Sequence, residues 1–322
     1  MIIRHFALVA ALGIAGCTTA TAQPIPAVAP AAAATADYPA LPVPRAMAER
    51  GVQRFLFSGW AGPALPVWYV RPTGTPADAP ILFVFHGVQR DADRYLSEWL
   101  DVATRERVIV VVPEFTREGF PGAPNYNHGR LIDRSGAAVP ITERTFAVIE
   151  PLFDALRQRE SLTASHYWMF GHSAGAQFVH RFIMTGNARR LERAVSANAG
   201  SYMFPDDRYA WPFGTGRLPA GIWAPQQAYA VPMTILLGTA DNDPNYPSLP
   251  REPEAMAQGP HRLARGHAFY AATRADSAAR NLPYAWDCRL VPNVAHDNGR
   301  MAPFGIAVLK GTAQLRSCAG DD

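Results

Sequence analysis

Three residues of the types used in nucleophilic catalysis occur along the chain in the order serine, aspartate, histidine. They are Ser173, within GHSAG at 171–175, Asp241 and His296. A serine hydroxyl is a weak nucleophile near neutral pH, so it needs a histidine to take its proton and a carboxylate to orient that histidine. We therefore expect Ser173 to be the nucleophile, His296 the general base and Asp241 the orienting acid.

The residues around Ser173 predict how its hydroxyl reaches a substrate. An apolar segment at 166–171 predicts a buried strand, and the residues from 174 to 185 predict a helix. A serine between these two elements projects clear of a sheet only on a very tight turn. Gly171 and Gly175 supply the space that such a turn needs.

The other two members follow predicted strands at 232–238 and 286–292. The carboxyl ends of strands form the edge where α/β sheets build their sites, so we expect Asp241 and His296 at that edge. Asp243 is a competing acid because it lies only two residues further on. Asp241 is favoured because it follows its strand more closely.

A fourth element is the apolar run 80–86, which ends in His86 and Gly87. A strand that delivers this pair to the same edge leaves the N–H of Val88 free to face a developing oxyanion. The N–H of Ala174, at the start of the helix, is its expected partner.

Apolar runs of strand type alternate with helical periodicity, which predicts an α/β fold with a mostly parallel, eight-stranded sheet and helices on both faces. The first two strands lack a helix between them and predict an antiparallel hairpin. The expected strands are 53–58, 66–71, 80–86, 107–113, 166–171, 193–197, 232–238 and 286–292. The expected helices are 92–105, 143–159, 174–185, 258–280 and 302–315.

With these elements, the chain resembles the α/β-hydrolase superfamily from about residue 50 to 318. It is most similar to the secreted esterases that include polyhydroxyalkanoate depolymerases and feruloyl or acetylxylan esterases. The motifs are FHG at 85–87, GHSAG at 171–175, LGTADND at 237–243 and VAHDNG at 294–299. The resemblance implies a serine esterase in which Asp241 is the triad acid. Val88 and Gln89 depart from the residues common after His-Gly in that group, which leaves the substrate class open.

The N-terminus predicts export. A cationic start is followed by an apolar run from 6 to 15, too short for a membrane span, so residues 1–16 are expected to be a cleaved signal. The residues before Cys17 resemble a bacterial lipoprotein box, which implies lipidation of Cys17. Thr18 after it points to the outer membrane, and hence to a protein of the periplasm or cell surface. An ordinary signal peptide with a chance cysteine is the alternative.

Residues 17–48 are rich in Ala, Pro and Thr and predict a tether, with the catalytic domain at 49–322. Apart from Cys17, the chain has two cysteines, Cys288 and Cys318. An even pair in a chain bound for an oxidising compartment predicts a disulfide, and two free buried thiols are the alternative.

The long segment 202–231 is rich in aromatic residues, Pro and Gly and predicts a lid over the site. Its aromatic side chains, with those after the fourth strand, predict a cleft for apolar acyl or polymeric ester chains, although ordinary packing explains them equally well. The expected substrate-binding residues are His86, Gly87, Tyr126 with its neighbours Asn125 and Asn127, His172, Tyr202, Trp211 and Trp223.

Composition limits the partners. The formal net charge is +3, from 30 basic and 27 acidic residues, and no basic stripe is present, so a nucleic acid is not expected. No organic cofactor is implied, and His86, His128, His172 and Glu114 lack the spacing of metal ligands. The expected partners are an ester substrate and a membrane surface reached through Cys17, and the sequence leaves the oligomeric state open.

Three other functions remain open on the sequence. The same triad serves serine peptidases, although these usually carry an additional large domain, and it serves hydrolases of carbon–carbon bonds in diketones. A surface-anchored binding protein on an inactive hydrolase is the third, but such relics generally lose a triad residue. All three residues are present here.

Overall fold

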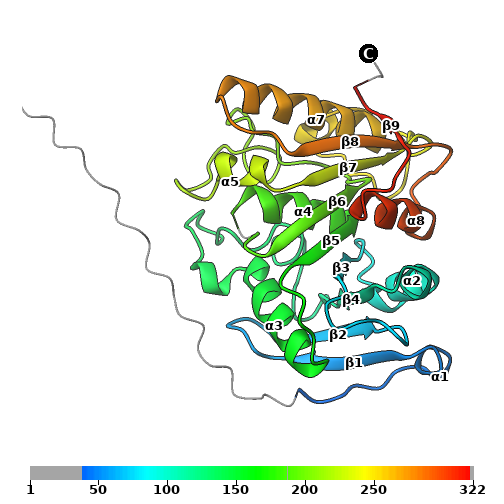
Figure 1. Ribbon diagram of the computed structural model, residues 1–322. Helices are drawn as coiled ribbons and strands as arrows, with labels where there is room; N and C mark the ends of the chain where they lie inside the picture. The colour runs from blue at the N-terminus through cyan, green and yellow to red at the C-terminus, as the bar shows by residue number, and fades with distance from the viewer. Residues whose placement is uncertain (1–37, 187, 320–322) are drawn as a thin grey trace, which may run out of the picture. The chain divides into compact units, whose positions relative to one another are not determined.

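A nine-stranded sheet is the centre of the part of the chain described by the computed structural model, residues 38–186 and 188–319 (Figure 1). The strand order is β1-β2-β4-β3-β5-β6-β7-β8-β9. The six strands from β4 to β8 in this order are parallel, and β1, β2 and β9 pair antiparallel at the two edges. The strands are β1 Val52–Phe57, β2 Leu65–Val70, β3 Ile81–Phe85, β4 Ile109–Pro113, β5 Tyr167–His172, β6 Leu191–Ala197, β7 Met233–Gly238, β8 Trp286–Val291 and β9 Arg316–Ser317. The mostly parallel α/β sheet is confirmed, and the ninth strand corrects the expected number of eight.

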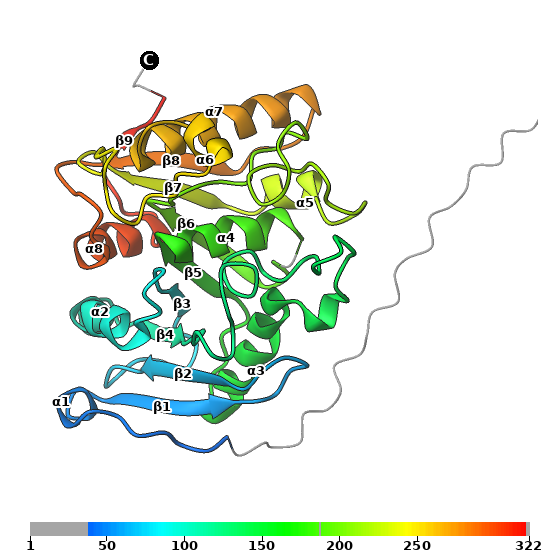
Figure 2. The ribbon, with the colours of Figure 1, turned by 180° about the vertical axis from the view of Figure 1, so that it is seen from behind.

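Helices cover both faces of this sheet (Figure 2). Side chains of α2 and α8 pack into one hydrophobic cluster, and those of α3, α4, α5 and α7 pack into another on the opposite face. The helices are α1 Arg45–Ala48, α2 Ala92–Glu106, α3 Ile149–Arg159, α4 Ala174–Met184, α5 Pro225–Ala230, α6 Pro253–Ala257, α7 Arg262–Ala279 and α8 Asn298–Leu309, with short 3₁₀ turns at Ile141–Glu143 and Thr145–Val148.

Two helices differ from their expected ranges for local reasons. The expected helix 258–280 begins only at Arg262, as α7, because Pro260 has no N–H to donate within a helix. The short helix α6, at Pro253–Ala257, precedes the expected range and was not predicted. The expected helix 302–315 instead begins at Asn298. The carboxylate of Asp297 accepts the N–H of Arg300 and so caps the helix four residues earlier.

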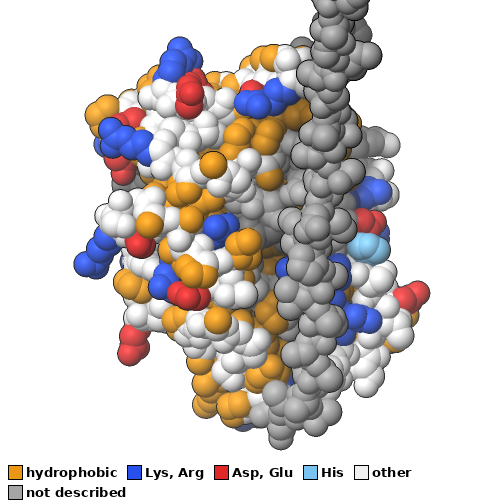
Figure 3. All heavy atoms as spheres, turned by 90° about the vertical axis from the view of Figure 1, so that its left-hand side faces the viewer, with side chains coloured by type: hydrophobic (Ala, Val, Ile, Leu, Met, Phe, Trp, Pro, Cys, Tyr) orange, Lys and Arg blue, Asp and Glu red, His pale blue; other side chains and the backbone are white. Residues whose placement is uncertain are grey.

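One face of the molecule mixes side chains of all types (Figure 3). On the part of that face not covered in grey, Lys and Arg lie among Asp and Glu, with hydrophobic side chains between them. A surface of mixed sign creates no strong field toward a polyanion.

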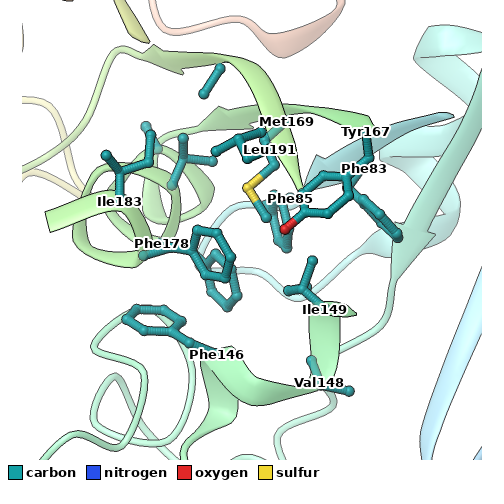
Figure 4. Close-up of a cluster of buried hydrophobic side chains, with 14 of the residues drawn as sticks. Phe83, Phe85, Phe146, Val148, Ile149, Tyr167, Met169, Phe178, Ile183 and Leu191 are labelled. Carbon is teal, nitrogen blue, oxygen red and sulfur yellow. The ribbon is translucent and has the colours of Figure 1, made fainter. Parts of the chain in front are cut away.

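The central strands are apolar along their whole length because both of their faces are buried. In β3, Phe83 and Phe85 point into one cluster, while Leu82 and Val84 point into the other. The ring of Phe85 stacks on Phe178 of α4, with 4.3 Å between the centroids (Figure 4). This contact places the start of α4 directly against the end of β3, which brings two elements of the expected site together.

The folded part of the chain begins earlier than expected. Tyr38 packs on Phe55 and Phe57 of β1, and Leu41 donates its N–H to Arg54 O. The segment from 38 to 48, which includes α1, therefore belongs to the fold, and the boundary at 49 between tether and domain is corrected. Cys17 and the expected signal lie outside the described residues. Within the described residues, no helix has the length and apolarity of a membrane span.

The predicted disulfide is present and joins Cys288 of β8 to Cys318, just beyond β9. Cys318 also donates its N–H to Cys288 O, so the bridge ties the short edge strand to the sheet. The sequence separation is 30 residues.

We expect Cys318→Ser to lower the free energy of unfolding by up to about 3–4 kcal/mol, because the chain without the bridge gains more conformational entropy on unfolding than the bridged chain does. Thermal unfolding with and without a reductant measures the effect. The reductant should destabilise the native chain and leave the variant unchanged. Equal sensitivity of the two proteins to the reductant would contradict a stabilising bridge.

Candidate active site

Ser173 occupies a strained turn between β5 and α4. Its backbone angles are φ 59° and ψ −116°, a region that residues other than glycine rarely adopt. Its N–H donates to Ala197 O at 3.0 Å, and its carbonyl accepts Gln177 N at 3.2 Å. The strand before it and the helix after it are both buried, so this turn is held rigidly from both sides.

The two glycines of GHSAG are required by close backbone approach. A Cβ at Gly171 would lie 2.1 Å from Gly175 O, and a Cβ at Gly175 would lie 1.9 Å from Phe85 O. Both distances are far inside contact range, so only glycine permits β3, β5 and α4 to meet here. The predicted reason for Gly171 and Gly175, namely the space needed by a tight turn, is therefore visible in the packing.

His296 and Asp241 meet across the ends of β8 and β7. The Nδ1 atom of His296 lies 2.7 Å from Asp241 Oδ2. The loops that carry them are joined as well, since Ala240 donates its N–H to Val294 O at 3.0 Å. A carboxylate only accepts hydrogen bonds, so Nδ1 carries the proton and Nε2 of the neutral ring is left as the acceptor. This tautomer can receive a proton from a hydroxyl.

Asp241, rather than Asp243, is the residue that contacts His296. Asp241 is buried, whereas Asp243 is exposed and its carboxylate accepts the N–H of Asn245. The structure therefore places at the imidazole the carboxylate that directly follows the Gly-Thr-Ala segment.

Ser173 and His296 line one cavity of about 330 Å³ at this edge of the sheet. Of the residues expected from the sequence, Gly87, Val88 and His172 line it too. The residues that the sequence reasoning missed are Gln89, Arg94, Tyr95, Glu98, Tyr246, Ser248, Asp297 and Asn298. Most of these are polar, and they come from α2, from the loop after β7 and from the start of α8. Of these, Tyr246 and Ser248 lie in the long segment between Asp241 and His296, whose length was the signal available for them in the sequence.

The two N–H groups expected to face an oxyanion come from the residue after Ser173 and from the loop after β3. Ala174 begins α4, and the first N–H groups of a helix have no acceptor within the helix. Val88 lies on an exposed loop at the cavity, where its carbonyl accepts from Arg117 at 3.0 Å. The side chain of Arg90 anchors the same loop by donating to three backbone carbonyls, at Phe115, Phe120 and Gly122.

The structure gives His86 a different place from the one expected. It is fully buried, and its Nε2 accepts the N–H of Phe115 at 3.1 Å. Burial lowers the pKa of His86 to about 3, so the ring is neutral. His86 therefore joins the ends of β3 and β4, and the expectation that it binds substrate is corrected.

The expected aromatic cleft is also corrected. Tyr126 and Tyr202 are fully buried, with Tyr126 OH donating to His86 O and Tyr202 stacked on Phe269. Trp223 packs against the ring of Tyr229. Trp211 lines a separate cavity of about 670 Å³ with residues from 121 to 134, which include Asn125, while the buried Asn127 donates to Gln177. The segment 202–231 thus contributes no residue to the cavity around Ser173.

The electrostatic surroundings of His296 lower its pKa from the ordinary value of 6.5. Burial is the largest cause, and the charge of Arg262 acts in the same direction, whereas the hydrogen bond with Asp241 raises the pKa. The ring of His172 lies 4.5 Å away, and burial holds its pKa well below the usual value, so it adds no charge.

We expect the activity of the protein to persist below the ordinary pKa of histidine. A general base works only when neutral, so kcat/KM should rise with pH through an apparent pKa below 6.5 and level off above it. A pH series of initial rates at low substrate concentration measures this limb. An apparent pKa above 7 would contradict it.

Among residues 38–186 and 188–319, no group of three or more His, Cys, Asp or Glu side chains is arranged to hold a metal ion. The polar groups at the cavity are instead engaged with one another, as in the contacts of Glu98 with Arg94 and Asn298.

Comparison with known proteins places this chain in a family. No protein-family model and no curated protein matches the sequence. Among solved structures, poly(aspartic acid) hydrolase-1 from Sphingomonas sp. KT-1 is 43% identical, with a TM-score of 0.75 over 79% of this chain and 96% of its own. A poly(3-hydroxybutyrate) depolymerase from Bordetella parapertussis is 30% identical, with a TM-score of 0.75 over 83% and 91%.

A third structure is similar in fold alone. It is an S-formylglutathione hydrolase from Agrobacterium tumefaciens, which is 14% identical with a TM-score of 0.51 over 81% of this chain and 95% of its own. The identity and coverage of the first two structures confirm the resemblance drawn from the motifs, and the chain therefore belongs to the α/β-hydrolase superfamily and is a hydrolase of that fold.

Proposed function

We propose that the protein is a serine hydrolase that cleaves carboxylic esters through an acyl-enzyme. The observation that carries this proposal is the 2.7 Å contact between His296 Nδ1 and Asp241 Oδ2, beside a cavity that His296 shares with Ser173. The strained backbone of Ser173 supports it, because such strain at a serine between strand and helix is typical of a nucleophile.

The reaction proceeds in two acyl transfers. His296 Nε2 takes the hydroxyl proton of Ser173 as its oxygen attacks the ester carbonyl, and Asp241 stabilises the imidazolium that forms. The N–H groups of Val88 and Ala174 receive the oxyanion. The proton then passes from His296 to the departing alcohol, which leaves an acyl group on Ser173. Water, deprotonated by His296, repeats the cycle and releases the acid.

The polymer hydrolases among the similar structures support a polymeric substrate. Both the poly(aspartic acid) hydrolase and the poly(3-hydroxybutyrate) depolymerase act on long chains, according to their names. In this protein, the cavity at Ser173 has no covering segment from 202–231, and its walls carry polar side chains such as Gln89 and Ser248. Such walls favour a polar chain over an aromatic or purely aliphatic acyl group.

Hydrolysis of amide bonds in a poly(aspartic acid)-like chain is the second candidate. Poly(aspartic acid) is a polyamide, and the hydrolase named for it has the higher identity of the two polymer hydrolases, 43% against 30%. The same triad cleaves either bond, because an acyl-enzyme forms from an amide as well as from an ester. The polar walls of the cavity also agree with a chain that carries carboxylates.

A labelling reaction and a substrate panel test the proposal together. A fluorophosphonate should modify Ser173, as read by peptide mass spectrometry, and an absence of labelling would favour the binding-protein alternative. The panel contains p-nitrophenyl esters of increasing chain length, a poly(3-hydroxybutyrate) film, poly(aspartic acid) and a diketone. Ester cleavage without loss of poly(aspartic acid) length supports the first candidate, and the reverse supports the second. Turnover of the diketone alone would contradict both.

A further inference from the structure

Arg262, the first residue of α7, lies behind the candidate acid. Its side chain is 1% exposed, and its Nη1 is 3.5 Å from Asp241 Oδ1. The other carboxylate oxygen, Oδ2, contacts His296. The carboxylate of Asp241 is therefore held between a guanidinium and an imidazole, with one oxygen toward each.

Arg262 also organises one wall of the cavity. Its Nη2 donates to Ser248 Oγ at 3.0 Å, and its guanidinium lies 4.6 Å from the centroid of the Tyr246 ring. The Tyr246 ring in turn meets His296 edge to face, at 5.1 Å and 71°. Tyr246, Ser248 and His296 all line the cavity. One buried side chain thus contacts the acid directly and the base through an aromatic ring.

A carboxylate partner is not the only way in which this helix buries an arginine. A buried cation is costly unless it is paired, and carbonyl oxygens of nearby loops are sufficient partners. Arg265, one turn further along α7, shows this alternative, because it is also buried and donates to Gly200 O, Gly259 O and Pro250 O. Arg262 instead has the carboxylate of Asp241 as its charged partner.

We propose that Arg262 is a positioning residue of the active site, which holds the Asp241 carboxylate from the side opposite His296 and keeps Tyr246 against the imidazole. The proposal rests on the function proposed above for Ser173, His296 and Asp241. Its physical consequence is twofold: the rotation of the carboxylate is restricted, and a positive charge near the imidazole disfavours its protonation.

The charges around His296 give the direction of this second effect. Asp241 and Asp297 raise the pKa of His296, Arg262 lowers it, and His172 is neutral. Across the cavity the charges offset each other in part, because Arg94 forms ion pairs with Asp91 and Glu98. Removal of the Arg262 charge therefore removes a group that lowers the pKa of His296 and leaves the carboxylates that raise it, so this pKa should rise.

Arg262→Met tests the proposal, because methionine removes the charge and keeps a long, unbranched side chain. We expect kcat for a p-nitrophenyl ester to fall about 10- to 100-fold, with KM changed less than about threefold, since misplaced catalytic groups affect the reacting state rather than substrate binding. The acidic limb of kcat/KM should move to higher pH by about half to one unit. Arg262→Lys keeps the charge and should leave this limb near its native position.

Arg265→Met is the matched control for a purely structural effect. It removes a buried arginine from the same helix without touching Asp241, so it should lower the melting temperature and leave the acidic limb in place. If Arg262→Met folds with a native melting curve and shows the native kcat and limb, the proposal is wrong. Should Arg262→Met not fold, Arg262→Gln replaces it. If Arg262→Met and Arg262→Gln both fail to fold while Arg262→Lys folds, the charge of Arg262 is required for folding, and the proposal is overturned.

The Ser173→Ala variant separates this inference from the function on which it rests. If that variant retains turnover, the proposed function itself is wrong. If it is inactive while the Arg262 variants keep the native limb and kcat, only the positioning role of Arg262 is wrong.

Discussion

Replacement of Ser173 by alanine is expected to lower kcat by about 10⁴- to 10⁶-fold, because it removes the hydroxyl proposed to form the acyl-enzyme. The remaining rate should come from the oxyanion-binding N–H groups and from substrate binding alone. The measurement is steady-state hydrolysis of the best ester or polymer substrate, with protein concentration high enough to detect the residual rate. Because the backbone at this position is strained, the folded state of the variant must be checked by thermal unfolding.

The control for this variant is Ser165→Ala, which removes an exposed hydroxyl just before β5 and should keep full activity. The double variant of Ser173→Ala with His296→Ala adds a second criterion. Residues that act as one unit show non-additive losses, so the double variant should be no slower than Ser173→Ala by more than about threefold. Fully additive losses would mean that Ser173 and His296 act separately, which contradicts a triad.

Replacement of Gly175 by alanine should prevent the protein from reaching its active fold. The added Cβ would lie 1.9 Å from Phe85 O and 2.5 Å from Phe85 C. Phe85 cannot retreat easily, because it is paired in register with Gly171 of β5 and its ring stacks on Phe178 of α4. We expect a loss of about 3 kcal/mol or more in the free energy of unfolding, measured by chemical denaturation, together with loss of activity.

Gly299→Ala is the control for this second variant. Gly299 lies in the first turn of α8, and its added Cβ would lie 3.4 Å from the nearest atom, Glu98 Cγ, an ordinary contact. Alanine is the better helix former, so stability should stay the same or increase slightly. A stable and active Gly175→Ala protein would show that the turn at Ser173 does not need the close approach described above.

Much of the fold could be predicted because its evidence is local. The continuous apolar runs of β3, β4 and β5 identify strands buried on both faces, and the structure confirms them within one or two residues. β9 could not be predicted, since a strand of two residues, Arg316–Ser317, has no periodicity to read. It pairs with β8 beside the bridge between Cys288 and Cys318.

The substrate-facing residues could be predicted far less well. Aromatic side chains in a long Pro- and Gly-rich segment fit a lid and a buried core equally, and composition does not separate the two. The structure places Tyr202 in the core through its stacking on Phe269, a residue of α7 more than sixty positions away. Nothing near Tyr246 in the sequence indicates that its ring meets His296.

The sequence alone determined the turn at Ser173, the order of Ser173, Asp241 and His296 after successive strands, and the parallel core of the sheet. These features follow from the steric limits and the burial patterns of residues that are neighbours in the sequence. Tertiary structure was needed to show that Asp241, which the sequence favoured over Asp243, contacts His296, and it alone showed that Arg262 lies behind Asp241. The physical reason is that these contacts join loops from different strands. Their geometry depends on strand order and on the packing of α7, which no local pattern of residues encodes.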